Sequence, residues 1–179
     1  MILTDRLRLR GWRDSDRDAF AALNADPDVS QDLGGPLDRA ESDAKLDRYI
    51  ASFEHDGFCR WLVEDLNQKF LGYAGVMPSR SGHPLGRHFD IGWRLVRQAW
   101  GRGYATEAAK ASLRDAFERA HLKEVLAYTS ADNVRSQAVI RRLNMQRAAS
   151  LDYSEPVGKE TWQGLVWIAR PSDGLVIQT

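Results

Sequence analysis

Alternating apolar and polar residues mark several short strands along this chain. The run LRLRGW at 7–12 alternates leucine with arginine, which is typical of an edge or surface strand with one buried face. The runs FCRWLVED at 58–65 and FLGYAGVMP at 70–78 flank the polar segment LNQK, so they predict a hairpin of two buried strands. Further strand-like runs occupy residues 89–96, 124–131 and 161–170.

Apolar residues at helical spacing predict helices over residues 16–25, 38–54, 106–120 and 133–145. Asp14 or Ser15 is a suitable N-cap for the first helix. Asp38 and Glu41 resemble a capping box for the second helix, and Gly57 stops it.

The order of these elements indicates the fold class. Strands dominate the first half, and one strand–loop–helix–strand–helix unit follows in the middle, without an internal repeat or a linker. We therefore predict an α+β (α/β-like) fold, in which helices cover a sheet, in a single domain over residues 1–179.

The charge and the cysteine content argue against several classes of function. The chain has 25 basic and 25 acidic residues, whereas nucleic-acid-binding domains usually carry a basic excess, so no nucleic-acid partner is expected. Cys59 is the one cysteine, which precludes a disulfide within the chain and fits a reducing compartment. The chain shows no apolar targeting segment and no long apolar run. We expect a cytoplasmic protein without a membrane partner.

A glycine pair directly before the third predicted helix is the first candidate for chemistry. Gly101, Arg102 and Gly103 follow a strand and precede a strongly helical segment. They either close a tight turn without a ligand, or expose backbone N–H groups that cradle a phosphate at the helix N-terminus. Trp100 should anchor this loop by packing, and Glu107 should complement the helix dipole.

The stretch at 91–108 resembles the acyl-CoA motif of GNAT N-acetyltransferases, Gln/Arg-x-x-Gly-x-Gly/Ala. It is similar to the RimJ/RimL-type branch, the ribosomal-protein N-terminal acetyltransferases, which write the loop Trp-Gly-Lys-Gly-Tyr-Ala-Thr-Glu-Ala; Arg102 replaces the Lys. The segment Asn133-x-x-Ser136 and the following Leu-Asn-Met also resemble that branch. Asn144 stands where the family usually has Gly, and Asn is the next-best residue for a left-handed helix cap.

This resemblance implies the GNAT fold, a central mixed, mostly antiparallel, twisted sheet flanked by helices, with splayed middle strands. It also implies acetyl-CoA as co-substrate and no metal. The loop amides would hold the pyrophosphate, the Leu95 N–H would polarise the thioester carbonyl, and Asn133 would bond the pantetheine arm. The implied cofactor-binding residues are Trp93, Leu95, Val96, Gly101, Arg102, Gly103, Tyr104, Ala105 and Asn133.

The resemblance further suggests an acid and a base. Many family members carry a proton-donating Tyr seven residues after the motif Asn, but Ile140 occupies that position here. In the RimL-like branch the Ser three residues after the Asn is the proposed acid, so Ser136 is the predicted acid. Asp90, at a position where relatives often carry Glu, is the predicted base, with a salt-bridged carboxylate as the alternative interpretation. His83 and His88 are alternative bases.

We therefore expect an acetyl-CoA-dependent N-acetyltransferase in which a primary amine attacks the thioester directly, since Cys59 lies far from both motifs. The acceptor is either a protein N-terminus or a small amine. A non-catalytic acyl-CoA-binding regulatory module with the same fold is the alternative. Pairing of the late strands between subunits would give a homodimer. Acids near the first two helices would attract a cationic acceptor or simply be solvated helix-end carboxylates; they are Asp26, Asp28, Asp32 and Asp38.

Overall fold

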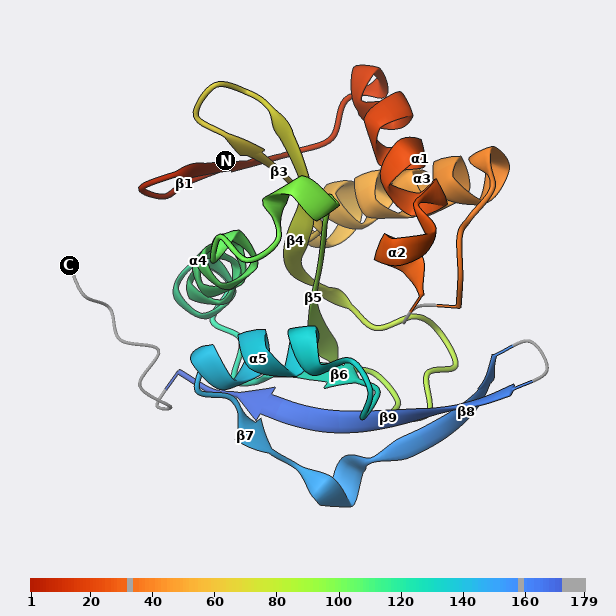
Figure 1. Ribbon diagram of the computed structural model, residues 1–179. Helices are drawn as coiled ribbons and strands as arrows, with labels where there is room; N and C mark the ends of the chain where they lie inside the picture. The colour runs from red at the N-terminus through yellow and green to blue at the C-terminus, as the bar shows by residue number, and fades with distance from the viewer. Residues whose placement is uncertain (32–33, 158–159, 172–179) are drawn as a thin grey trace.

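The predicted strands pair into one long sheet (Figure 1). The computed structural model describes residues 1–31, 34–157 and 160–171. The strands are β1 (Ile2–Leu3), β2 (Leu7–Arg10), β3 (Trp61–Asp65), β4 (Phe70–Pro78), β5 (Phe89–Leu95), β6 (Val125–Thr129), β7 (Gln146–Arg147), β8 (Tyr153–Val157) and β9 (Glu160–Ala169). Their order in the sheet is β1-β2-β3-β4-β5-β6-β9-β7, and β8 pairs with β9. Only β5 and β6 pair in parallel among the described strands, which confirms a mixed, mostly antiparallel sheet.

Helices flank this sheet, as expected. They are α1 (Arg17–Ala25), α2 (Pro27–Ser30), α3 (Arg39–Asp56), α4 (Tyr104–Glu118) and α5 (Val134–Arg142), with 3₁₀ turns at Asp14–Asp16, Arg97–Ala99 and Ala149–Leu151. No helix in the described ranges is long and apolar enough to cross a membrane.

Local signals fix both ends of α3. The Asp38 side chain accepts the Glu41 N–H at 2.8 Å, and the Glu41 carboxylate accepts the Asp38 N–H at 2.9 Å. Gly57 ends the helix in a left-handed conformation, with φ +71°. The predicted capping box and the glycine stop are therefore confirmed. Asn144 also takes the left-handed conformation expected after α5, with φ +54°.

One local prediction was wrong, and one strand was not predicted. Asp16, and neither Asp14 nor Ser15, is the residue before α1, because a 3₁₀ turn occupies Asp14–Asp16. The Asp16 carboxylate accepts the Arg13 N–H at 2.8 Å and pairs with Arg10. Strand β8 was not predicted at all. Its sequence YSEPV contains a proline and no apolar run, and it forms a strand only through its pairing with β9.

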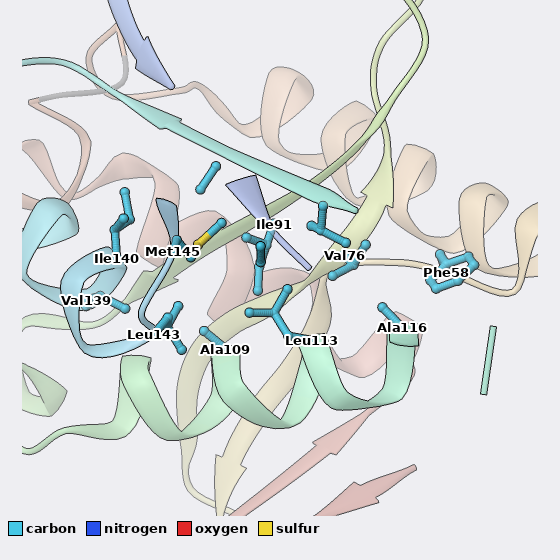
Figure 2. Close-up of a cluster of buried hydrophobic side chains, with 13 residues drawn as sticks. Phe58, Val76, Ile91, Ala109, Leu113, Ala116, Val139, Ile140, Leu143 and Met145 are labelled. Carbon is cyan, nitrogen blue, oxygen red and sulfur yellow. The ribbon is translucent and has the colours of Figure 1, made fainter. Parts of the chain in front are cut away.

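Clusters of buried hydrophobic side chains lie on both faces of β4 and β5. Figure 1 shows α4 on one side of these strands and α1 and α3 on the other. On one face α4 presents Ala109 and Leu113 to Val76 and Ile91 of these strands, as Figure 2 shows. The alanines of α4 let the helix lie close to the sheet. On the other face α1 and α3 pack over Tyr73, because side chains alternate along β4. The centre of the sheet is thus packed between helices on both faces, and this packing positions β5, along which the site lies.

Candidate active site

Strands β5 and β6 begin side by side and then separate. They run parallel and share one registered pair, Asp90 with Leu126. On its other edge β5 pairs with β4, and the N–H of Val96 donates to a β4 carbonyl at 2.9 Å. Because alternate residues of an antiparallel ladder direct their backbone groups to the partner strand, those of Trp93 and Leu95 face the gap. This is the splay that the resemblance implied.

The loop after β5 turns through two glycines in left-handed conformations. The φ angles are +73° at Gly101 and +79° at Gly103, a region that costs other residues roughly 1–2 kcal/mol. No side chain of the described ranges caps α4, which begins directly after Gly103, and the first intrahelical bond joins the Glu107 N–H to the Gly103 carbonyl at 3.0 Å. The N–H groups of residues 104–106 therefore have no partner within the helix and can hold an anion.

Side chains from elsewhere fix this loop. Arg6 donates from Nη1 to the Arg102 carbonyl at 3.0 Å and from Nε to the Glu107 carboxylate at 2.7 Å. Glu107 is thus structural, as predicted. Trp100 does more than pack: its Nε1 donates to the Leu95 carbonyl at 2.8 Å. The loop is therefore bonded both to the N-terminal segment and to the end of β5.

A first cleft of about 420 Å³ lies between this loop, β5 and α5. The residues predicted to bind the cofactor that line it are Trp93, Leu95, Gly101, Gly103, Tyr104, Ala105 and Asn133. Val96 and Arg102 do not line it. The Val96 N–H is bonded to Leu71 and its carbonyl accepts the Ala99 N–H, so its backbone is occupied. Arg102 is exposed.

The start of α5 forms the opposite wall. The Asn133 side-chain oxygen accepts the Ser136 N–H at 3.0 Å, so Asn133 is the N-cap of α5 while its side-chain amide lies at the cleft. Ser136 is half-buried one turn into the helix. The Arg135 guanidinium lies over the Trp100 ring, 4.1 Å from its centroid, which ties α5 to the glycine loop.

A second cleft of about 370 Å³ opens among α3, β5, β6 and the pair β8–β9. Ionisable and aromatic side chains line much of it, including Lys45, Tyr49, Arg60, Tyr73, Asp90, Tyr128, Tyr153, Glu155 and Trp162. Four residues line both clefts, namely Trp93, Arg94, Asn133 and Ser136. The two clefts therefore meet at the splay, beside the backbone of β5.

Asp90 lies in the second cleft, but not as a free carboxylate. It is 6 % exposed and forms an ion pair with Arg60, which also donates to the Asp90 carbonyl at 2.7 Å. Burial and the nearby Asp90 carboxylate raise the pKa of Tyr128. Sequence inspection found Asp90 but not Arg60, because the two residues lie 30 positions apart and meet only through the pairing of β3, β4 and β5.

The two candidate histidines, His83 and His88, lie outside the lining of the second cleft. The His83 Nε2 lies 3.1 Å from the Tyr153 hydroxyl, and its Nδ1 accepts the Leu85 N–H at 3.1 Å. Burial, with a contribution from His88, lowers the pKa of His83. Neither histidine lines the cleft itself, but His83 contacts the Tyr153 ring and His88 contacts the Tyr128 ring, and both tyrosines line it.

The acids near the first helices are engaged elsewhere. Asp26 and Asp28 both pair with Arg97, at 3.1 and 2.5 Å, and Asp38 caps α3. Asp32 lies outside the described residues. None of the three described acids lines either cleft.

The residues that sequence inspection missed are the cations and phenols of the second cleft. Arg94 donates from Nη1 to the Asn24 side-chain oxygen at 2.6 Å, and its buried Nε has no hydrogen-bond partner in the part of the chain that the structure describes. Burial alone would raise the pKa of the Tyr73 phenol, but the charges of Arg94 and Lys45 outweigh it and lower this pKa to about 7. The alternation of side chains along β4 and β5 could have predicted that Tyr73 and Arg94 lie on one face of the sheet. It could not have predicted which other charged side chains gather on that face.

Comparison with known proteins matches residues 6–146 to the family described as Acetyltransferase (GNAT) domain. FsC-acetyl coenzyme A-N(2)-transacetylase of Aspergillus fumigatus is 41% identical over 145 residues, which are 76% of this chain and 61% of that protein.

Solved structures agree on the fold. An acetyltransferase from Agrobacterium tumefaciens superposes with a TM-score of 0.80 at 26% identity, covering 94% of this chain and 93% of that one. RimL, the ribosomal L7/L12 alpha-N-protein acetyltransferase, was solved with coenzyme A. It gives a TM-score of 0.75 at 17% identity, with 93% and 95% coverage.

Proposed function

The chain belongs to the GNAT acetyltransferase family, and we propose that it transfers the acetyl group of acetyl-CoA directly to a primary amine. The main support for this proposal is that two clefts meet where β5 and β6 separate. One cleft ends at uncapped helix amides, and the other is lined by ionisable side chains. A regulatory module that only bound an acyl-CoA would need no second cleft, so this arrangement favours a transferase.

The first cleft has the chemistry that a CoA thioester requires. The free N–H groups of residues 104–106 and the positive end of α4 suit a pyrophosphate. Gly101 and Gly103 take the left-handed conformations that turn the loop into α4. The backbone groups of Trp93 and Leu95 face the gap and offer strand-like hydrogen bonds to an extended, amide-containing arm.

The end of β5 would stabilise the charge that develops on the reacting oxygen. When bound, acetyl-CoA supplies an activated acetyl group and a thiolate leaving group. The Leu95 N–H, directed into the gap, would donate to the reacting carbonyl oxygen. Trp100 bonds the Leu95 carbonyl and so fixes the backbone here before substrates arrive.

Ser136 and Asp90 are the proposed proton-transfer residues. Ser136 lines both clefts, so its hydroxyl is suited to protonate the leaving sulfur. Asp90 lines the second cleft and would accept the amine proton, directly or through a water. Direct attack is supported by Cys59: it is fully buried, and burial raises the pKa of its thiol to about 12, so it is not a nucleophile.

Thiol release with a panel of primary amines tests this proposal. We expect release of free thiol that requires both acetyl-CoA and an amine, together with an acetylated product detected by mass spectrometry. A protein that binds acetyl-CoA but releases no thiol with any amine would instead support the regulatory module.

A further inference from the structure

The charges in the second cleft do not balance. Five charged side chains line it, Lys45, Arg60, Asp90, Arg94 and Glu155. Arg60 pairs with Asp90, and Glu155 pairs with Arg80 outside the lining. Lys45 and Arg94 have no carboxylate partner among the residues that the structure describes. Two positive charges are therefore left without an acidic counterpart.

Arg94 is the more deeply placed of the two cations. Its residue is 6 % exposed, and it bonds a neutral partner, the Asn24 side-chain oxygen. Asn24 is itself fixed, since its amide donates to the Phe20 carbonyl and to the Ser42 hydroxyl, each at 3.0 Å. The Nε of Arg94 is buried and has no hydrogen-bond partner among the described residues. A buried cation with an unused donor is costly unless a ligand completes its bonding.

Lys45 approaches the same place from α3. Its ammonium lies 5.5 Å from the centroid of the Tyr73 ring, and the Arg94 guanidinium lies 6.0 Å from the same centroid. Lys45 is half-buried, and burial lowers the pKa of its ammonium. Both cations thus lie near one aromatic ring, and all three side chains belong to residues that line the second cleft.

We propose that Arg94 and Lys45 bind an anionic oxygen group on the amine acceptor. This inference rests on the proposed function. A guanidinium can donate two parallel hydrogen bonds to a carboxylate or a phosphate, and the ammonium supplies a second point charge. Arg94 lies between Trp93 and Leu95, whose backbone would hold the acetyl-bearing arm of the cofactor. An anionic group bound by Arg94 would therefore lie close to the reacting amine, within one small molecule. A cleft of about 370 Å³ has the size of a small-molecule site. An amino-acid-like acceptor meets these conditions.

Tyr73 is the competing source of negative charge. The same two cations lower the pKa of its phenol to about 7, so its ionised form offsets part of the positive charge in the empty cleft. A bound carboxylate would take over this role and return the phenol to its neutral form.

Calorimetric titration of the CoA-loaded protein tests the inference without relying on turnover. The probes are N-acetylated amino acids with apolar, polar and acidic side chains, each beside its carboxamide, and one N-acetylated aminoalkylphosphonate. We expect at least one acid to bind about tenfold or more tightly than its carboxamide, because hydrogen bonds to charged groups contribute more than neutral ones. Tighter binding of the phosphonate than of the carboxylates would assign the site to phosphate.

Two lysine variants complete the test. Lys45→Met keeps most of the length of the side chain without its charge, and it should reduce the difference in affinity between acid and carboxamide to within about threefold. Lys123→Met, at an exposed position away from both clefts, should leave it unchanged. If no acid binds more tightly than its carboxamide, the inference is overturned. Thiol release with amines that carry no carboxylate or phosphate would show in that case that the proposed function still stands.

Discussion

The Trp100 indole donates to the carbonyl oxygen of Leu95 at 2.8 Å, which joins the glycine loop to the last residue of β5. Trp100→Phe keeps an aromatic ring for Arg135 but removes this bond. We expect acetyl-CoA affinity to fall about three- to tenfold, because one hydrogen bond contributes roughly 1 kcal/mol. Thermal unfolding should change little. An unaltered affinity would mean that the bond plays no part in positioning β5.

Ser136 contributes its backbone N–H, and not its hydroxyl, to the cap of α5. Ser136→Ala should therefore leave the helix and acetyl-CoA binding intact. We expect kcat to fall about tenfold, less than many general acids provide, because a thiol is a fair leaving group. Steady-state kinetics with saturating acetyl-CoA measure this. A decrease below about threefold, or roughly 0.7 kcal/mol, would remove Ser136 as the acid.

Asp90→Asn acts on both stability and rate. Removing the charge leaves Arg60 buried without its partner, which typically costs about 3–5 kcal/mol of unfolding free energy. Chemical denaturation would measure this loss. If Asp90 is also the base, the rate per folded molecule should fall at least about tenfold.

A stability loss with an unchanged rate per folded molecule would leave Asp90 a purely structural role. Arg60→Met is the matched control, because it breaks the same ion pair without removing the carboxylate.

Tyr73 should titrate far below an ordinary tyrosine. It faces Lys45 and Tyr49 on α3, Arg94 on β5 and the charge of Arg60, and its pKa is lowered to about 7. As pH rises through this value, tyrosinate absorbance should appear in the folded protein, whereas free tyrosines ionise near about 10. The step should be absent in Tyr73→Phe. In Lys45→Met its midpoint should move to higher pH; a midpoint that does not move would exclude Lys45 as a cause.

Local signals predicted much of the fold. The capping box at Asp38 and the stop at Gly57 depend on a few neighbouring residues, so they could be read directly from the sequence. Strand β8 could not, since its pairing with β9 and not its own composition makes it a strand. The cap of α1 was misplaced for a related reason: Asp16 is held by Arg10 and Arg13, which shift the start of the helix.

The candidate site likewise has one part that local sequence motifs predict and another part that they do not. The glycine loop and the cap at Asn133 are contiguous motifs, and both lie in the first cleft. The charge balance of the second cleft arises from elements far apart in sequence, such as Lys45 on α3 and Arg94 on β5. Spacing along the chain carries no information on such contacts. The expected homodimer stays a prediction.

Acetyl-CoA binding at the start of α4 is the central claim, and calorimetric titration of a Thr106 pair tests it most directly. Thr106 lines the first cleft in the first turn of α4, where Glu and Gln are both tolerated by a helix. Thr106→Glu adds negative charge beside the expected pyrophosphate, and Thr106→Gln adds the same bulk without charge. We predict that the wild type binds acetyl-CoA and that Glu weakens binding at least about tenfold more than Gln does. Equal affinities in both variants, or no binding by the wild type, would contradict the account.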